Sequence, residues 1–369
     1  MLRDDRQSYG FSDPGLWPSE SQELLLQAAL WNDEAALAAW DKWRSAIDLD
    51  GDIDRGTFRL LPMLYKRMLA LGVKDPLMQQ LGSVYRWSWV ESNQILRYMK
   101  PVLDGLRNEG VATLLLKGAP LAYDFYEYPG MRPMADFDVL VPLAEVPTVI
   151  EFLSTSDWRP REELSTAVHR FRHSIPFFNA SEQEFDLHWH ALTEVRSEDA
   201  GREFWANSVP FRVDGIESRR LDTTDSLIHA IVHGIRWNPE PPIRWIADAM
   251  VLINKDPGGV QWDRVTRFAE RHGLAYRLTI GLRYLKERMA ADVPDDVLRS
   301  LNEIHITLLE RLERTTTLRP TDHPSNSLFG GIMGNLCEYQ RIACCPTERR
   351  RALGFLDYMC YRRKLGCRR

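Results

Sequence analysis

The sequence of 369 residues has few cysteines, no long apolar run and no excess of basic residues. Its 5 cysteines lie in the last tenth of the chain without a Cys-x-x-Cys pair, which argues against a disulfide framework and a structural zinc site. No apolar run approaches the roughly 20 residues that span a bilayer. The first residues are too charged for a signal peptide. We therefore expect a cytoplasmic protein with reduced thiols and no membrane partner.

The charge balance argues against a broad nucleic-acid-binding surface. The formal net charge is -5 and the pI is about 6.0, so the chain as a whole has no basic field. Hydrophobic residues make up 44% and charged residues 27%, as in a soluble globular protein. The chain is long enough for two or three regions of domain size.

Periodicity divides the chain into three regions. Apolar residues recur three and four positions apart in the first part, which predicts a helical N-terminal region over 1–97. A helix over 92–108 is expected to bend, or to restart, at Pro101. Short strands and helices then predict an α/β unit over 98–215, and helical periodicity returns in a C-terminal domain over 216–369. The expected strands are 111–116, 134–141, 173–179 and 184–190. The predicted fold class is α+β, a small mixed sheet flanked by helical regions.

Three acidic residues are the main candidates for chemistry. Asp136 and Asp138 are two apart on one strand, so their side chains are expected on the same face. Asp186 lies on a later strand whose other face carries Phe185 and Leu187. Neighbouring carboxylates repel each other unless one is protonated or a cation lies between them. The pattern therefore predicts a Mg²⁺ site, with Mn²⁺ as an alternative, although Asp-x-Asp is also common in turns and on exposed strand faces.

A phosphate-binding turn is expected just before the acids. Lys117 and Gly118 follow a strand and precede a helix, where unpaired backbone N–H groups and a lysine can bind phosphate. Glycine at such a turn can also serve only for its backbone freedom. Arg132 is a second candidate phosphate ligand, and its alternative role is a salt bridge that neutralises the acids when no metal is bound.

The three segments together resemble the nucleotidyltransferase superfamily, whose fold is that of DNA polymerase β. Segments 115–122, 131–141 and 185–189 carry Leu-Lys-Gly, then Arg-Pro-x-x-Asp-x-Asp, then a third acid. They look most like bacterial proteins described as uncharacterised nucleotidyltransferases, and the resemblance covers about residues 95–290.

The resemblance implies a metal-dependent transfer of a nucleoside monophosphate from an NTP substrate to an acceptor hydroxyl, with release of pyrophosphate. By position, Asp136 and Asp138 would bind the metal ions that bridge the triphosphate. Asp186 would help to hold the second metal and lower the pKa of the acceptor, or take its proton. Gly118 would lie against the phosphates. The superfamily usually has a serine or glycine where Ala119 follows here, so Lys117 would replace the missing hydroxyl.

Four further polar residues each have alternative roles. His188 and His190 lie on the predicted face of Asp186 and would contact phosphate, assist proton transfer or serve as hydrogen-bond partners. Arg244 and Asp248 are one helical turn apart, so they would form an ion pair within the helix, or Arg244 would reach the triphosphate.

Two other functions fit the same residues. One is a non-catalytic nucleotide-binding scaffold that keeps the fold, and the other is a metal-dependent phosphoester hydrolase. The acceptor of a transferase would be a tRNA, a protein, a peptide or a small molecule, and the sequence does not choose among them. Base preference and oligomeric state are not indicated either.

Overall fold

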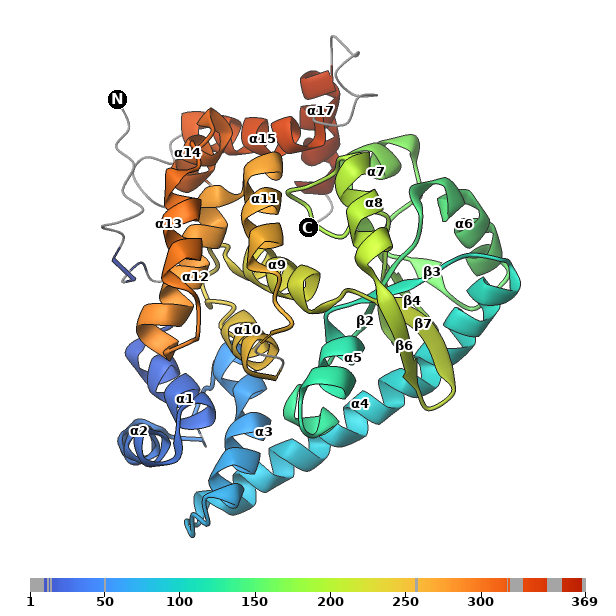
Figure 1. Cartoon of the computed structure of the whole chain (residues 1–369). Coiled ribbons are helices and arrows are strands. Elements are labelled where there is room, and N and C mark those ends of the chain that lie inside the picture. Colours follow the sequence, from blue (N-terminus) through green and yellow to red (C-terminus); the bar gives the residue numbers. More distant parts are fainter. Residues whose placement is uncertain are drawn as a thin grey trace.

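The computed structural model describes residues 10–366 except 12, 14, 50, 256–257, 317, 319–327 and 344–353. A seven-stranded mixed sheet lies beside the N-terminal and C-terminal helices, as Figure 1 shows, and the predicted fold class is confirmed. Among the described helices, none is both long and apolar enough to cross a membrane.

The N-terminal region consists of four helices, and the first three begin at side-chain caps. Ser19 and Gln22 form a reciprocal capping box, and Asn32 and Asp54 accept backbone N–H bonds at the next two helix starts. The helices are α1 (Glu20–Leu30), α2 (Asp33–Ala46), α3 (Arg55–Ala70) and α4 (Leu77–Asn108).

Helix α4 continues through Pro101 for 32 residues. The expectation that a new helix begins at Pro101 is therefore wrong, and the helix begins 15 residues before the predicted start at residue 92. Its second half buries Met99, Val102 and Leu103 beneath the sheet. This packing offsets the backbone hydrogen bond that proline cannot make.

The sheet has the strand order β3-β4-β5-β2-β1-β7-β6. Strand β2 pairs antiparallel with β1 on one side and parallel with β5 on the other, so it is a central strand. β1 also pairs parallel with β7, which extends the sheet past the predicted boundary at residue 215. The strands are β1 (Leu114–Leu116), β2 (Phe137–Leu140), β3 (Arg159–Pro160), β4 (Ser174–Phe178), β5 (Glu184–His188), β6 (Val209–Val213) and β7 (Ile216–Arg220).

Short helical segments connect these strands. They are α5 (Gly118–Pro120), the π-helix η1 (Leu121–Phe125), the 3-10 turns η2 (Pro129–Met131) and η3 (Leu143–Glu145), α6 (Val146–Ser154), α7 (Thr166–Phe171) and α8 (Glu198–Asn207). The C-terminal helices are α9 (Thr223–Gly234), α10 (Arg244–Lys255), α11 (Trp262–His272), α12 (Ala275–Met289), α13 (Asp295–Glu303), α14 (Leu308–Thr316), α15 (Leu328–Ala343) and α17 (Gly354–Gly366).

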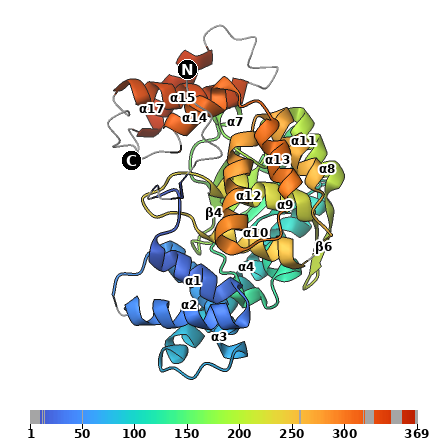
Figure 2. The same cartoon turned by 60° about the vertical axis from the view of Figure 1, so that its left-hand side comes forward.

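Two hydrophobic cores divide the molecule differently from the sequence regions. One core joins α1–α3 to α9–α13, and Figure 2 shows these two groups of helices stacked. The other lies between α4, α6 and one face of the sheet, where Phe137 and Phe185 stack with ring centroids 5.0 Å apart. The opposite face of β2 and β5 is left for polar side chains.

A buried ion pair ties the segment before β2 to α10. Arg132 Nε and Nη2 donate to the two carboxylate oxygens of Asp248 at 2.7 and 2.8 Å, and the Tyr126 hydroxyl donates to Asp248 at 2.7 Å. The side chains of Arg132 and Asp248 are only 2% and 7% exposed. This contact fixes α10 above the end of the sheet from which the acids project.

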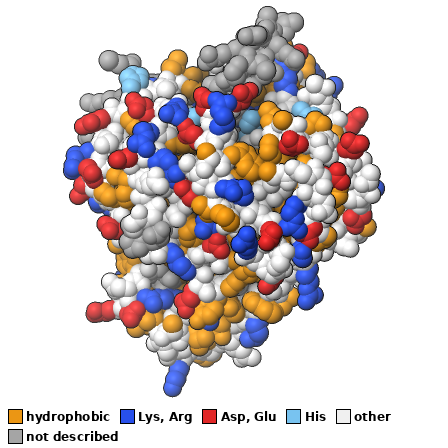
Figure 3. All heavy atoms as spheres, turned by 45° about the vertical axis from the view of Figure 1, so that its right-hand side comes forward, with side chains coloured by type: hydrophobic (Ala, Val, Ile, Leu, Met, Phe, Trp, Pro, Cys, Tyr) orange, Lys and Arg blue, Asp and Glu red, His pale blue; other side chains and the backbone are white. Residues whose placement is uncertain are grey.

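On the face that Figure 3 shows, the surface is not divided into an acidic and a basic region. Acidic and basic side chains are interspersed there. This agrees with a net charge of only -5.

The close packing of α9 on α10 gives a first prediction. A Cβ on Gly234 would lie 2.1 Å from the Trp245 ring, so Gly234→Ala forces these helices apart. We expect a loss of about 1–3 kcal/mol in the free energy of unfolding, measured by urea denaturation. Gly201→Ala in α8 is the matched control, because nothing lies within 4 Å of its added methyl group. Equal stability of the two variants would contradict this packing.

The buried ion pair gives a second prediction. Asp248→Asn leaves the Arg132 charge buried without its counter-charge, which is expected to lower the free energy of unfolding by about 3–5 kcal/mol. The control is Glu217→Gln, which removes an exposed partner of Arg107 and is expected to change stability by at most about 1 kcal/mol. Urea denaturation of both variants tests this prediction. If the free energy of unfolding of Asp248→Asn changes by less than about 1 kcal/mol, the pair does not anchor α10.

Candidate active site

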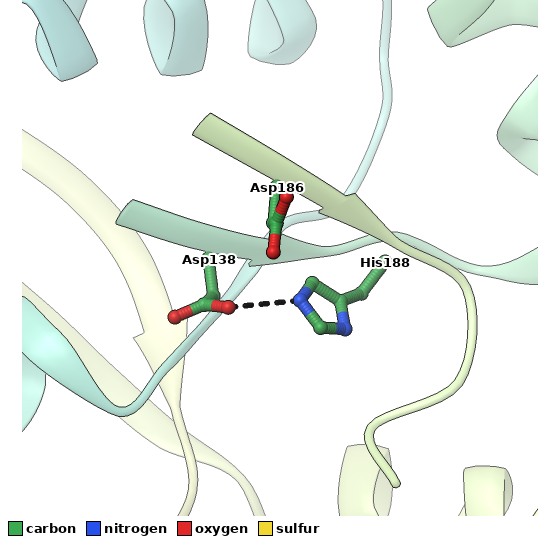
Figure 4. A group of neighbouring side chains, drawn as sticks. All are labelled: Asp138, Asp186 and His188. Carbon is green, nitrogen blue, oxygen red and sulfur yellow. Dashed lines mark hydrogen bonds and ion pairs between the residues drawn. The ribbon is translucent and has the colours of Figure 1, made fainter. Parts of the chain in front are cut away.

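The parallel pairing of β2 with β5 brings two acids together. Asp138 and Asp186 are direct partners across the two strands. Their carboxylates extend to the same side of the sheet, with the His188 ring turned toward Asp138, as Figure 4 shows. The alternating residues Phe185 and Leu187 are fully buried in the core on the other side. The predicted division of this strand into a core face and a polar face is confirmed.

Asp138 is the most strongly held acid of the site. Its Oδ1 atom lies 2.8 Å from Lys117 Nζ and 2.9 Å from His188 Nε2. Burial opposes the charged carboxylate, but Lys117 and His188 outweigh this and hold the pKa of Asp138 well below its ordinary value. An ionised carboxylate only accepts hydrogen bonds, so His188 Nε2 carries the proton in this contact.

Lys117 reaches Asp138 from an unusual backbone conformation. It lies between β1 and α5 with φ of 49° and ψ of −106°, a region that residues other than glycine rarely adopt. Such a conformation costs on the order of 1–3 kcal/mol and persists only where the surroundings enforce it. Here β1 on one side and α5 on the other direct the side chain onto the acid.

The other two acids are shifted in the opposite direction. Burial and the charges of Asp138 and Asp186 raise the pKa of Asp136 to about 6. Burial also raises the pKa of Asp186, with Asp138 adding to the effect and His188 opposing it. Asp136 lies one residue before β2 and lines the same cavity as the other two acids. In the metal-free site Asp136 and Asp186 therefore bind protons more readily than ordinary aspartates do. A bound cation would displace these protons.

A metal ion fits the donor set of the site. Ligand atoms of Asp138, Asp186 and His188 all lie within 4.8 Å of one another. Two carboxylates suit a hard cation such as Mg²⁺ or Mn²⁺, whereas an imidazole suits softer metals. His188 already donates to Asp138 from Nε2, so in this state it is placed to orient a metal ligand. Asp136 is outside this group of three, although it had been predicted as a metal ligand.

Two adjoining cavities lie beside the acids, and only the smaller one contains them. The smaller, of about 440 Å³, contains all three acids together with Arg161 and Arg172. The larger, of about 590 Å³, lies between α3, the α5 segment, α9 and α10. Six residues line both cavities and are called the junction here: Arg59, Lys117, Arg132, His233, Arg236 and Arg244. Five of them are basic.

The predicted phosphate ligands Lys117, Arg132 and Arg244 have different partners in the structure. Arg132 is buried in the pair with Asp248, a different acid from those that the sequence suggested for it. Arg244 lines both cavities, and its Nη1 donates to the Pro133 carbonyl at 2.9 Å. Lys117 bonds to Asp138. Among these side chains, Arg132 has the least freedom to meet a ligand.

Gly118 and His190 are placed by packing. A Cβ on Gly118 would lie 3.1 Å from Met134 Sδ, so the residue is small because the loop before β2 passes close to it. His190 follows β5, and burial lowers its pKa to about 4. Its carbonyl lies 3.4 Å from His188 Nδ1.

Arg59 and Arg236 are site residues that the sequence did not suggest. Arg59 comes from α3 in the N-terminal region, and Arg236 follows α9. They are 177 positions apart, and each lies among ordinary charged helix residues. No motif marks either one, so only the packing of α3 against α10 reveals that they meet.

Comparisons with known proteins agree with the superfamily that the sequence resembles. No curated protein matches the chain. A solved structure of an antigenic nucleotidyltransferase-like protein from Paracoccidioides brasiliensis is 12% identical, covers 60% of this chain and 93% of its own, and has a TM-score of 0.30. Residues 57–290 match the family described as "Uncharacterised nucleotidyltransferase". Because this match spans more than half of the chain, the protein belongs to the uncharacterised nucleotidyltransferase family.

Proposed function

We propose that the protein transfers a nucleoside monophosphate from a nucleoside triphosphate to an acceptor hydroxyl, with a divalent cation, Mg²⁺ or Mn²⁺, held by Asp138 and Asp186. The observation that carries the proposal is the pairing of these acids on β2 and β5 at a cavity that basic side chains also line. Acidic and basic side chains in one cavity suit a metal–polyphosphate substrate.

In the proposed reaction the acceptor oxygen bonds to the α-phosphorus while the bond from this phosphorus to the bridging oxygen breaks. Pyrophosphate leaves, and the hydroxyl proton passes to the Asp186 carboxylate. Asp186 suits this role because burial raises its pKa above that of an ordinary aspartate. A bound cation supplies neutralisation of the phosphate charge.

The side chains around Asp138 have supporting roles in this proposal. His188 orients the Asp138 carboxylate through its Nε2 proton. Lys117 neutralises Asp138 in the free site, and when a cation takes over this task its ammonium is free to contact a phosphate oxygen. Asp136, beside the other acids, adds negative charge that strengthens cation binding.

The residues of the site favour transfer over a purely structural role. A scaffold has no need for Asp138 and Asp186 as direct partners on neighbouring strands, because like charges placed opposite each other destabilise a sheet. A phosphoester hydrolase would use the same acids, so product analysis is required to separate it from a transferase. A hydrolase yields free phosphate or a nucleoside diphosphate, whereas a transferase yields pyrophosphate and a labelled acceptor.

The activity is tested by incubating the protein with Mg²⁺, a cell extract and each α-labelled nucleoside triphosphate. Pyrophosphate release and a labelled acceptor are expected with at least one nucleotide. Asp138→Asn and Asp186→Asn should each lower the rate by more than about 10²-fold, because each removes charge that acts on the transferred group. His188→Gln should lower it by about 10–100-fold. Exposed Asp157→Asn is the control and should keep full activity.

Absence of product with all four nucleotides would overturn the proposed transfer. Product that forms equally well with Asp186→Asn would overturn the assigned role of this acid. Both results are interpretable only for variants whose urea unfolding midpoint matches that of the unaltered protein.

The raised pKa values predict how metal binding depends on pH. Because the pKa of Asp136 is about 6 and that of Asp186 is also raised, protons compete with the cation below this value. Mn²⁺ affinity, measured by electron paramagnetic resonance, should rise at least about fourfold between pH 5.5 and pH 7.5. Asp136→Asn should flatten this rise. An affinity that is constant over this range would show that these carboxylates do not take part.

A further inference from the structure

The junction between the two cavities gathers five basic side chains, and two of these side chains have neither a hydrogen bond nor a salt bridge within the described residues. Arg59 and Arg236 line both cavities. Within the part of the chain that the structure describes, neither guanidinium group forms a hydrogen bond or an ion pair. By contrast, Arg132 and Lys117 at the same junction are paired with Asp248 and Asp138.

The basic side chains of the junction also repel one another. Arg55, Arg132, Arg236 and Arg244 each interact unfavourably with the charge of Arg59. Burial and neighbouring arginines lower the pKa of Arg59 and Arg244, while Asp136 and Glu240 oppose the shift at Arg59. Guanidinium groups nonetheless stay charged at neutral pH. Such a cluster stores unfavourable energy that a bound polyanion would relieve.

Close packing holds Arg59 at this place. The first turn of α3 lies against the segment before α10, because a Cβ on Gly56 would be 3.2 Å from both the Pro241 carbonyl and Ile243 Cγ1. Arg59 is three residues further along α3, on the same side as Gly56. The first turn of α10 adds the partial positive charge of a helix N-terminus to the larger cavity.

Arg236 is held from the other side. It lies two residues after the end of α9, and its backbone N–H donates to the Gly234 carbonyl at 2.9 Å. Gly234 lies against the Trp245 ring of α10, so the turn that carries Arg236 is fixed by the α9–α10 contact. The guanidinium groups of Arg59 and Arg236 therefore come from two separate elements that pack on α10.

We infer that Arg59 and Arg236 bind the β- and γ-phosphates of the nucleoside triphosphate, and that α3 is thereby part of the active site. The inference rests on the proposed function for the identity of the substrate. The acids of β2 and β5 place the α-phosphate in the smaller cavity, and the junction beside them is where the remaining phosphates meet unpaired guanidinium groups. Guanidinium groups bind phosphate oxygens in a bidentate manner that lysine does not match.

Inorganic tripolyphosphate in the presence of EDTA tests the inference without metal or turnover. Isothermal titration calorimetry of the full chain at physiological salt should show saturable binding. Arg59→Gln and Arg236→Gln should each weaken this binding by about tenfold or more, since each removes a charged hydrogen-bond donor. Arg59→Lys should restore part of the affinity. The control Arg212→Gln removes an exposed positive charge on β6 and should leave binding unchanged.

The possible outcomes separate the inference from the proposed function. Binding that depends on Arg59 and Arg236 in a protein without transferase activity would support the inference and overturn the proposed function. Transferase activity that is insensitive to both substitutions would overturn the inference alone. Failure of the unaltered protein to bind tripolyphosphate, or an equal loss in Arg212→Gln, would also overturn it. Matching urea midpoints exclude unfolding as the cause of lost binding.

Discussion

The buried pair of Arg132 and Asp248 is the contact on which the arrangement of the site depends. It joins the residues just before β2 to α10, over a separation of 116 positions in the chain. A second, weaker polar contact joins the same two segments, since Arg244 Nη1 of α10 donates to the Pro133 carbonyl at 2.9 Å. The pair has both carboxylate oxygens occupied and a third donor in Tyr126, which is the geometry that makes a buried pair tolerable.

Acidic and basic side chains gather around this pair. Acids on β2 and β5 line the smaller cavity, and guanidinium groups from α3, the turn after α9, and α10 line both cavities. In the free protein Lys117 lies against Asp138 and offsets part of the acidic charge. A metal–polyphosphate complex would satisfy both sides at once, because it brings a cation to the acids and anionic oxygens to the arginines. The helices of the N-terminal region thus serve the site as well as the core.

The sequence was sufficient for those parts of the site that depend on local rules. Alternation along the strand of Asp186 and His188 predicted which face is polar, and the order of Lys117, Asp138 and Asp186 indicated the family. Contacts between distant segments could not be predicted. Arg132 pairs with Asp248 because the segment before β2 lies against α10, and Arg59 comes near Arg236 because α3 packs against α10. Pairing of β7 with β1 likewise depends on a long-range register that no local pattern encodes.

The central claim is that the acids of β2 and β5 form the metal site for a nucleoside triphosphate. The most direct measurement is a crystal structure of the protein with Mn²⁺ and non-hydrolysable analogues of the four nucleoside triphosphates. The account predicts an anomalous Mn²⁺ peak between the carboxylates of Asp138 and Asp186, with Lys117 Nζ displaced from Asp138 toward a phosphate oxygen. A peak at other residues, or an analogue bound away from these acids, would contradict it.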